Sequence, residues 1–333
     1  IAGVDAVELL RAFLARIPAG NLKAVAHRIV HGGTRFTRPT RLDAAPEQAL
    51  RELSALAPLH NPRALEWLAA ARTAVAGEVA HIGVFDTAFF ATLPAVAATY
   101  AVPAAIGSAL GVRRYGFHGL AHESMWLRWQ ALRPDLARGG RLITLQLGGG
   151  CSAAAIHGGQ PIDTSMGFSP LEGLVMATRS GDVDPAIVAF LSRQLGESAE
   201  RIVERLNTEA GLLGVSGRSS DVTTLLRDPS PEARFAVELY CYRARKYIGA
   251  YLAALGGCDG IAVGGGVGEH VPEVRTGMLR GMAWAGIELD EDANARAVGG
   301  DARISAAGSA VHVHVVPVDE DRGLARAAAA CLG

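Results

Sequence analysis

The sequence has few cysteines, no excess of either charge and no long apolar run, and each shortage argues against a class of protein. Its four cysteines form no C-x-x-C pair, so neither a zinc site nor a disulfide framework is indicated, and a reducing cytoplasm is the expected location. Lysine and arginine total 32 against 33 aspartates and glutamates. A chain without a basic surplus is not expected to bind nucleic acid.

A membrane protein is not expected either. The longest weakly polar run, residues 101–112, is broken by Pro103, Gly107 and Gly111 and is too short to cross a bilayer. No polybasic cluster favours binding to a lipid surface. The chain opens on Ile1 without the charged start and cleavage site of a signal peptide. We therefore expect further residues to precede Ile1 in the intact protein.

The chain has 333 residues, of which 50% are apolar, so two domains are expected. Apolar runs bounded by glycine and proline predict strands, and longer amphipathic segments predict helices. The predicted strands are residues 24–30, 78–86, 142–147, 153–156, 260–263 and 311–316. The predicted helices are residues 4–17, 46–57, 63–75, 184–194, 198–207 and 232–255, with a last helix opening at Asp319-Glu320-Asp321.

Residues 142–185 hold the strongest functional signals. The apolar run at 142–147 ends on Gly148-Gly149-Gly150. Glycines let backbone N–H groups converge on an anion, although a plain hairpin turn explains them as well. A long loop then reads DTSMGFSPLEGL from Asp163 and TRSGDVDP from Thr178. Such a loop inside a compact domain is uncommon unless it is functional.

Several other positions allow both a structural and a functional interpretation. Arg28 lies within an apolar run, where an unpaired guanidinium is costly, so it either pairs with an acid or faces an anion in a cleft. Asp86 ends a strand, which suits chemistry as well as a helix N-cap. His118 and His122 have the spacing of two zinc ligands, but no acidic third ligand stands beside them. The glycine loop at 264–268 is compatible with a nucleotide and nonspecific by itself.

Several motifs in order resemble the acetate kinase family along essentially the whole chain: HRIVHGG at 27–33, PLHNP at 58–62, RRYGFHG at 113–119, and the DTSMGFSPLEGL and TRSGDVDP segments. The resemblance implies an α/β, two-domain actin-like ATPase (ribonuclease H-like) fold with an interdomain cleft. Residues 1–86 plus 320–333 would form the acid-binding domain. Residues 87–319 would form the nucleotide-binding and dimerisation domain of a homodimer.

The resemblance also implies reversible, Mg²⁺-dependent phosphoryl transfer from ATP to acetate, giving acetyl phosphate and ADP. Acetate is already ionised at neutral pH, so Asp86 makes better sense near the metal than as a base. By the same resemblance, Arg28 and Arg179 bind the carboxylate and the moving phosphoryl group. His60 and His118 contact that group, and Asp86 and Glu320 organise the metal. The implied methyl pocket is Val30, Leu59, Phe117 and Pro170. The implied nucleotide site is Gln146, Gly148, Gly149, Gly150, Asp221, Val222, Thr223, Gly265, Gly266, Gly268 and Glu269.

The chain departs from the family pattern at several positions. Gln146 stands where the family usually has histidine, Gly149 where it has asparagine, and Thr223 where it has arginine. The family's opening strand, with its N-x-G-S-S-S phosphate loop, is absent, so we expect an incomplete N-terminal sheet. Three functions stay open: an acetate kinase, a propionate kinase of the same family, or a catalytically impaired binding or scaffold subunit. The intact arginines, histidines and aspartate of the implied site favour an enzyme.

Overall fold

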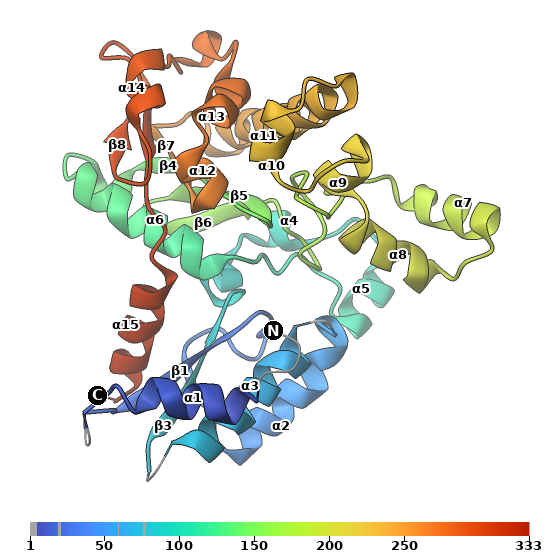
Figure 1. Ribbon diagram of the computed structural model, residues 1–333, viewed down its shortest axis with the longest axis vertical. Helices are drawn as coiled ribbons and strands as arrows, with labels where there is room; N and C mark the ends of the chain where they lie inside the picture. The colour runs from blue at the N-terminus through green and yellow to red at the C-terminus, as the bar shows by residue number, and fades with distance from the viewer. Residues whose placement is uncertain (1–4, 19–20, 59, 76–77, 333) are drawn as a thin grey trace. The chain divides into compact units, whose positions relative to one another are not determined.

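The computed structural model describes residues 5–18, 21–58, 60–75 and 78–332 (Figure 1). Contacts divide the chain into two compact units. The first unit comprises Ile1–Ala91, Phe117–Leu120 and Asp319–Gly333, and the second comprises Thr92–Gly116 and Ala121–Val318. The C-terminal segment therefore belongs with the N-terminal unit, together with four residues from the middle of the chain. The predicted domain bounds, at residues 86 and 320, stay a prediction.

The first unit is built on a three-stranded sheet with the order β1-β3-β2. Strands β1 (Ala24–Ile29) and β3 (Ala80–Phe85) are parallel, and Arg28 is paired with Val84 in their register. The short strand β2 (Thr40–Arg41) runs antiparallel to β3. Because β1 and β3 are parallel, their carboxyl ends meet at the same edge of the sheet. The residues that follow both strands are therefore neighbours.

Helices provide the apolar side chains that cover this sheet. One core cluster joins Leu50 of α2 (Ala44–Glu52) and Leu68 of α3 (Asn61–Ala74) to Phe85 of β3. A second cluster joins Ile82 and Val84 of β3 to Ala328 of α15 (Glu320–Leu332). Because side chains alternate between the faces of a strand, these clusters place α2 and α3 on one face and α15 on the other. The unit also contains α1 (Ala6–Leu14) and a 3₁₀ helix at Leu53–Leu56.

The second unit is built on a six-stranded sheet with the order β6-β5-β4-β7-β9-β8. Its central strands β4 (Arg141–Leu147), β7 (Gly260–Gly264) and β9 (His312–Val315) are parallel. The outer strands β5 (Cys151–His157), β6 (Gln160–Thr164) and β8 (Ala302–Arg303) pair antiparallel. Strand β4 is followed by a turn of three glycines, whereas β7 is followed directly by α12 (Gly265–His270). The glycine loop predicted at 264–268 is therefore wrong, because its glycines form the first turn of a helix. The parallel register of β4 and β7 brings these two glycine turns to one edge of the sheet.

The helices of the second unit begin at residues suited to capping. Asp184, Ser198 and Ser230 each accept a backbone hydrogen bond at a helix start, as short polar side chains at N-caps usually do. The helices are α4 (Ala95–Ala98), α5 (Ala104–Leu110), α6 (Gly119–Leu132), α7 (Pro185–Leu195), α8 (Ala199–Thr208), α9 (Gly211–Ser216), α10 (Val222–Arg227), α11 (Pro231–Leu255), α12 (Gly265–His270), α13 (Pro272–Leu279) and α14 (Glu291–Arg296). The first two residues of α6 belong to the first unit.

The predicted strands and helices are confirmed, with shifted bounds. The strand predicted at 78–86 is β3, which begins at Ala80, and the one predicted at 311–316 is β9, which is shorter. The helix predicted at 46–57 is wrong at its C-terminal end, because α2 stops at Glu52 and a 3₁₀ helix follows. Every helix in the described part of the chain is too short or too polar to cross a membrane.

Candidate active site

Arg28, Asp86 and Glu320 form one ionic cluster in the first unit. Nε and Nη2 of Arg28 donate to the two carboxylate oxygens of Asp86 at 2.9 and 2.8 Å, and Nη1 donates to Glu320 Oε2 at 2.5 Å. Strand β1 carries Arg28, Asp86 follows β3, and Glu320 opens α15. The structure thus pairs Arg28 with acids, which was one of its two interpretations. Its role in binding a substrate stays a prediction.

Burial of this cluster shifts its protonation equilibria. The Asp86 side chain is 2% exposed. Burial raises the pKa of its carboxyl, and the facing Arg28 guanidinium opposes that shift. Burial also raises the pKa of Glu320, again opposed by Arg28. A buried carboxylate without its cation would be strongly destabilising, so Arg28 is required to keep Asp86 charged.

In the first unit, the side chain of Asn61 holds the backbone of His31 with two hydrogen bonds. Its Nδ2 donates to the carbonyl of His31 at 3.0 Å, and its Oδ1 accepts from the His31 amide at 3.2 Å. The His31 ring contacts Phe117 edge-on with centroids 5.4 Å apart. His60, just before α3, is exposed and close enough to lower the pKa of the Asp86 carboxyl. Val30 is partly buried, whereas Leu59 lies outside the described residues.

His118 has a strained backbone beside Asp86. Its φ is 59°, a left-handed conformation that only Arg138 shares among the described residues other than glycine. Gly119 begins α6 and donates its amide to the Asp86 carbonyl at 3.0 Å. A Cβ at Gly119 would overlap that carbonyl, so the close approach requires glycine. Strained residues of this kind cluster at functional sites.

The zinc interpretation of His118 and His122 gains no support. His122 is fully buried, with Nδ1 2.7 Å from Thr144 Oγ1 and Nε2 2.8 Å from Ser152 Oγ. Burial lowers its pKa to about 3, so the imidazole is neutral. Among the described residues, no group of three or more histidines, cysteines and acids is placed to hold a metal. His122 is therefore a buried residue that links α6 to the sheet.

Arg179 in the second unit differs from Arg28. Its Nη1 donates to the Pro170 carbonyl at 2.7 Å. Burial lowers the pKa of its guanidinium, an effect that Cys151 opposes, and among the described residues of its own unit Arg179 forms no ion pair with a carboxylate. Arg28 is neutralised by two carboxylates, whereas Arg179 keeps its positive charge uncompensated. A partly buried cation in this state is suited to bind an anion.

The two glycine turns follow β4 and β7. A Cβ at Gly149 or Gly266 would meet no atom within 4 Å, so the packing of the described residues leaves open space there. Gly265 has φ 79°, and a Cβ there would press on Gln146 and on the Leu147 carbonyl. Gln146 is paired with Gly264, and its Oε1 is buried with no hydrogen-bond partner among the described residues. Both turns can therefore receive a ligand with backbone N–H groups.

Two residues predicted to bind the nucleotide, Glu269 and Asp221, form hydrogen bonds that stabilise the second unit. Glu269 Oε1 accepts from the amides of Gly265 at 3.0 Å and Val318 at 3.1 Å, which holds the second glycine turn in place. Asp221 caps α10 by accepting from the Thr223 amide and hydroxyl, both at 2.7 Å, and Val222 is buried. Contact of these residues with a nucleotide stays a prediction.

Two residues that support the site, Cys151 and Thr87, were not predicted from the sequence. Cys151 Sγ is 3.3 Å from the Gly148 carbonyl and 3.0 Å from the Tyr240 hydroxyl, so it ties the first glycine turn to α11. Thr87 Oγ1 accepts from the Gly32 amide at 3.0 Å and fixes the turn after β1. Thr87 directly follows Asp86, and Cys151 directly follows the three glycines. Adjacency to a functional motif was the signal that could have identified both.

The fold is that of the actin-like ATPase class, and comparisons with known proteins show the family. A model of the acetokinase family matches residues 6–326. The chain therefore belongs to the acetokinase family, which confirms the predicted family and the predicted enzyme class.

Individual relatives show how close the likeness is. The acetate kinase of Solibacter usitatus is 43% identical over 316 residues, which cover 94% of this chain and 76% of that protein. The acetate kinase of Clavibacter sepedonicus is 45% identical over 313 residues, covering 93% and 78%. Among solved structures, Porphyromonas gingivalis acetate kinase has a TM-score of 0.92 at 38% identity, covering 98% of this chain and 84% of that chain. A propionate kinase from Francisella tularensis has a TM-score of 0.90 at 32% identity, covering 97% and 83%. These structures confirm the predicted fold class.

Proposed function

We propose that the chain catalyses reversible phosphoryl transfer from ATP to acetate, giving acetyl phosphate and ADP. The observation that carries this proposal is the uncompensated charge of Arg179, held by the Pro170 carbonyl in a partly buried loop. The transferring phosphoryl group develops negative charge on three equatorial oxygens and needs positive charge around it. The close acetate kinase relatives support acetate as the acceptor.

The chemistry requires alignment more than proton transfer. An acetate oxygen attacks the γ-phosphorus as the bond from that phosphorus to the leaving ADP oxygen breaks. Because acetate is ionised at neutral pH, no general base is needed, and preorganised positive charge lowers the barrier. Arg179, with the imidazoles of His60 and His118, would stabilise the moving group. Arg28 would contact the acetate carboxylate while holding Asp86.

The same residues fit a requirement for Mg²⁺. Asp86 and Glu320 supply hard carboxylate oxygens, and Mg²⁺ in kinases is typically bound through one or two carboxylates and the substrate phosphates. A site of two acids is therefore consistent with the lack of a larger ligand cluster among the described residues. When bound, the ion would neutralise charge on the phosphates. The glycine turns after β4 and β7 would hold the nucleotide.

Propionate is the second candidate acceptor, and the propionate kinase likeness favours it as an additional substrate. Val30 is partly buried and Phe117 is 1% exposed, which suits a small apolar pocket. We further propose a cytoplasmic homodimer. Phe235 and Tyr242 of α11 are 58% and 52% exposed and lie on one side of the helix at a spacing of seven residues, which would suit contact with a second copy.

Acetyl phosphate formation, trapped as the hydroxamate, tests the proposal. The purified chain should convert acetate with ATP and Mg²⁺, convert propionate less well and convert butyrate much less well. One methylene is worth only about 1–3 kcal/mol of discrimination in an apolar pocket. ATP binding without any acyl phosphate would instead support the scaffold alternative. A larger kcat/KM for propionate than for acetate would make propionate the preferred acceptor.

A further inference from the structure

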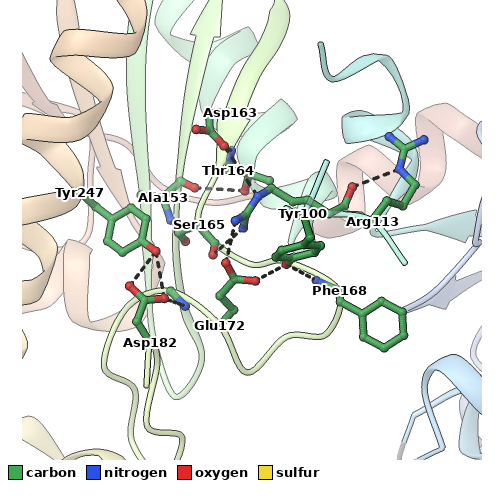
Figure 2. A network of polar contacts seen from close by, with 12 residues as sticks. Tyr100, Arg113, Ala153, Asp163, Thr164, Ser165, Phe168, Glu172, Asp182 and Tyr247 are labelled. Atoms are coloured by element: carbon green, nitrogen blue, oxygen red, sulfur yellow. Dashed lines mark hydrogen bonds and ion pairs between the residues drawn. The ribbon is translucent and has the colours of Figure 1, made fainter. Parts of the chain in front are cut away.

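The loop that carries Pro170 and Arg179 is held by a network of polar side chains, shown in Figure 2. It connects the end of β6 to the start of α7, residues 165–184. It contains no regular helix or strand, so its conformation depends on tertiary contacts. Some of these are backbone hydrogen bonds, such as Ala177 N to the Gly149 carbonyl at 3.1 Å and Ser180 N to the Leu206 carbonyl at 3.0 Å, and the others involve side chains. The side-chain contacts come from the segment around Tyr100 and Arg114 and from α11.

Glu172 is the centre of this network. Arg114 Nη2 donates to its Oε1 at 2.6 Å, and the Tyr100 hydroxyl donates to its Oε2. The Tyr100 oxygen in turn accepts from the Phe168 amide at 2.8 Å. Arg114 Nη1 reaches the Ser165 carbonyl at 3.2 Å, and its guanidinium lies 5.4 Å from the centre of the Tyr100 ring. Two side chains therefore fix three points within eight residues of the loop.

Gly167 shows how closely the loop backbone approaches these groups. A Cβ at Gly167 would overlap both the Glu172 carboxylate and the Tyr100 hydroxyl. The Gly167 carbonyl also accepts from the Tyr115 amide at 3.0 Å. The backbone before Pro170 is consequently held against the Tyr100–Glu172 pair with no room for a side chain.

A second group of hydrogen bonds holds residues 173–182 of the loop. Gly173 N donates to Asp182 Oδ1 at 2.8 Å, and Asp182 N donates to the Gly173 carbonyl at 3.0 Å. The Tyr247 hydroxyl of α11 donates to Asp182 Oδ2 at 2.9 Å. Residues 173–182 thus form a closed section that carries Arg179. The bond from Arg179 to the Pro170 carbonyl joins this section to the part held by Glu172.

We propose that Glu172 and Tyr100 are positioning residues for phosphoryl transfer. They fix the backbone at residues 168–170, and through the Pro170 carbonyl they set the direction of the Arg179 guanidinium. This inference rests on the proposed function, because the direction of Arg179 matters only if Arg179 contacts the transferring group. A displacement of about 1 Å at such a group can cost on the order of a hundredfold in rate. Loosening this network should therefore reduce kcat.

Tyr100→Phe is the sharpest test, because it removes one hydroxyl and keeps the ring beside Arg114. Tyr251→Phe is the matched control, since the Tyr251 hydroxyl is buried with no hydrogen-bond partner among the described residues. For Tyr100→Phe we expect kcat to fall about tenfold to a hundredfold, with KM for ATP within about twofold of the unsubstituted chain. The lost bonds to Glu172 and Phe168 should cost about 1–3 kcal/mol of stability, which lowers the thermal midpoint by no more than about 12 °C, so kcat is measured well below that midpoint. Tyr251→Phe should keep full kcat.

Glu172→Gln provides a second variant. It should lower kcat at least as much as Tyr100→Phe, and the double variant should lose no more than the larger single loss, because both residues act on one segment. The inference is overturned if Tyr100→Phe keeps kcat within twofold, if Tyr251→Phe loses as much, or if KM for ATP rises in step with the fall in kcat. An unsubstituted chain that makes no acyl phosphate would instead overturn the proposed function, and the inference with it.

Discussion

Arg275 is wholly buried and forms hydrogen bonds, but no ion pair with a carboxylate of the described residues. Its Nε donates to Asn294 Oδ1, Nη1 to the Gly268 carbonyl, and Nη2 to the carbonyls of Asn294 and Ala297, all at 2.7 Å. Burial lowers its pKa to about 10, so it remains a cation at neutral pH. Arg275 therefore connects the glycine turn after β7 to the end of α14.

Arg275→Met would leave these four oxygens without their donor. A buried acceptor that loses its partner costs about 1–3 kcal/mol, but the substitution also removes the cost of burying the cation. Because of that offset, we take the lower value, about 1 kcal/mol, for each of the four oxygens. The free energy of unfolding should then fall by about 4 kcal/mol. For a unit of this size, each kcal/mol shifts the thermal midpoint by about 2–4 °C, so a decrease of roughly 8–16 °C is expected.

Differential scanning calorimetry of the whole chain would measure this shift. Arg128→Met is the matched control, because Arg128 forms a largely exposed pair with Asp301, and such pairs contribute about 0–1 kcal/mol. A decrease for Arg275→Met no larger than that of the control would refute the reasoning, since the four bonds would then contribute nothing. Because Gly268 lies in α12, we also expect KM for ATP to rise in the Arg275 variant.

Three further predictions follow from the site and the core. Arg179→Lys should lower kcat by orders of magnitude, because a point charge does not replace a planar guanidinium, and near-native hydroxamate formation would contradict the assignment. Val30→Ala should narrow the ratio of kcat/KM between acetate and propionate, whereas an unchanged ratio would place Val30 outside the pocket. His122 has a folded pKa near 3, lowered by burial from 6.5, so its stabilising effect is present above pH 6.5 and is lost as the pH falls toward 3. His122→Gln should reduce the slope of unfolding free energy against pH by up to about 1.4 kcal/mol per unit over that range, and equal slopes in urea titrations would oppose this.

The sequence predicted those regular elements whose patterns are local, whereas others, among them α6 and α14, were not predicted. Leu142–Leu147 is a continuous apolar run that stops at glycine, and β4 ends at Leu147. Asp184 followed by Pro185 is a start signal within two residues, and α7 begins there. Strand β2 has only two residues and depends on pairing with a distant strand, so no local pattern could predict it.

The sequence predicted which residues form the candidate site, but their ion-pair and hydrogen-bond partners were less predictable. The sequence predicted that Arg28, within an apolar run, either pairs with an acid or faces an anion, and the structure pairs it with Asp86 and Glu320, although its side chain is 36% exposed rather than buried. Glu320 is 292 positions away in the chain, and such a pairing follows only from the return of the C-terminal helix to the first sheet. Glu172 stands within the DTSMGFSPLEGL motif, but its contacts with Tyr100 and Arg114 come from another segment and could not be predicted from the sequence.

At His118, the left-handed backbone conformation lowers the stability of the fold, whereas the imidazole is proposed to serve catalysis. A side chain in this conformation costs about 1–2 kcal/mol relative to glycine, which adopts it freely. Glycine at position 118 should therefore relax the backbone while deleting the imidazole proposed to contact the phosphoryl group. Selection for heat resistance alone would favour glycine, and selection for turnover would retain histidine. Persistence of histidine there in a laboratory evolution experiment that rewards growth on acetate would measure how strongly catalysis outweighs the strain.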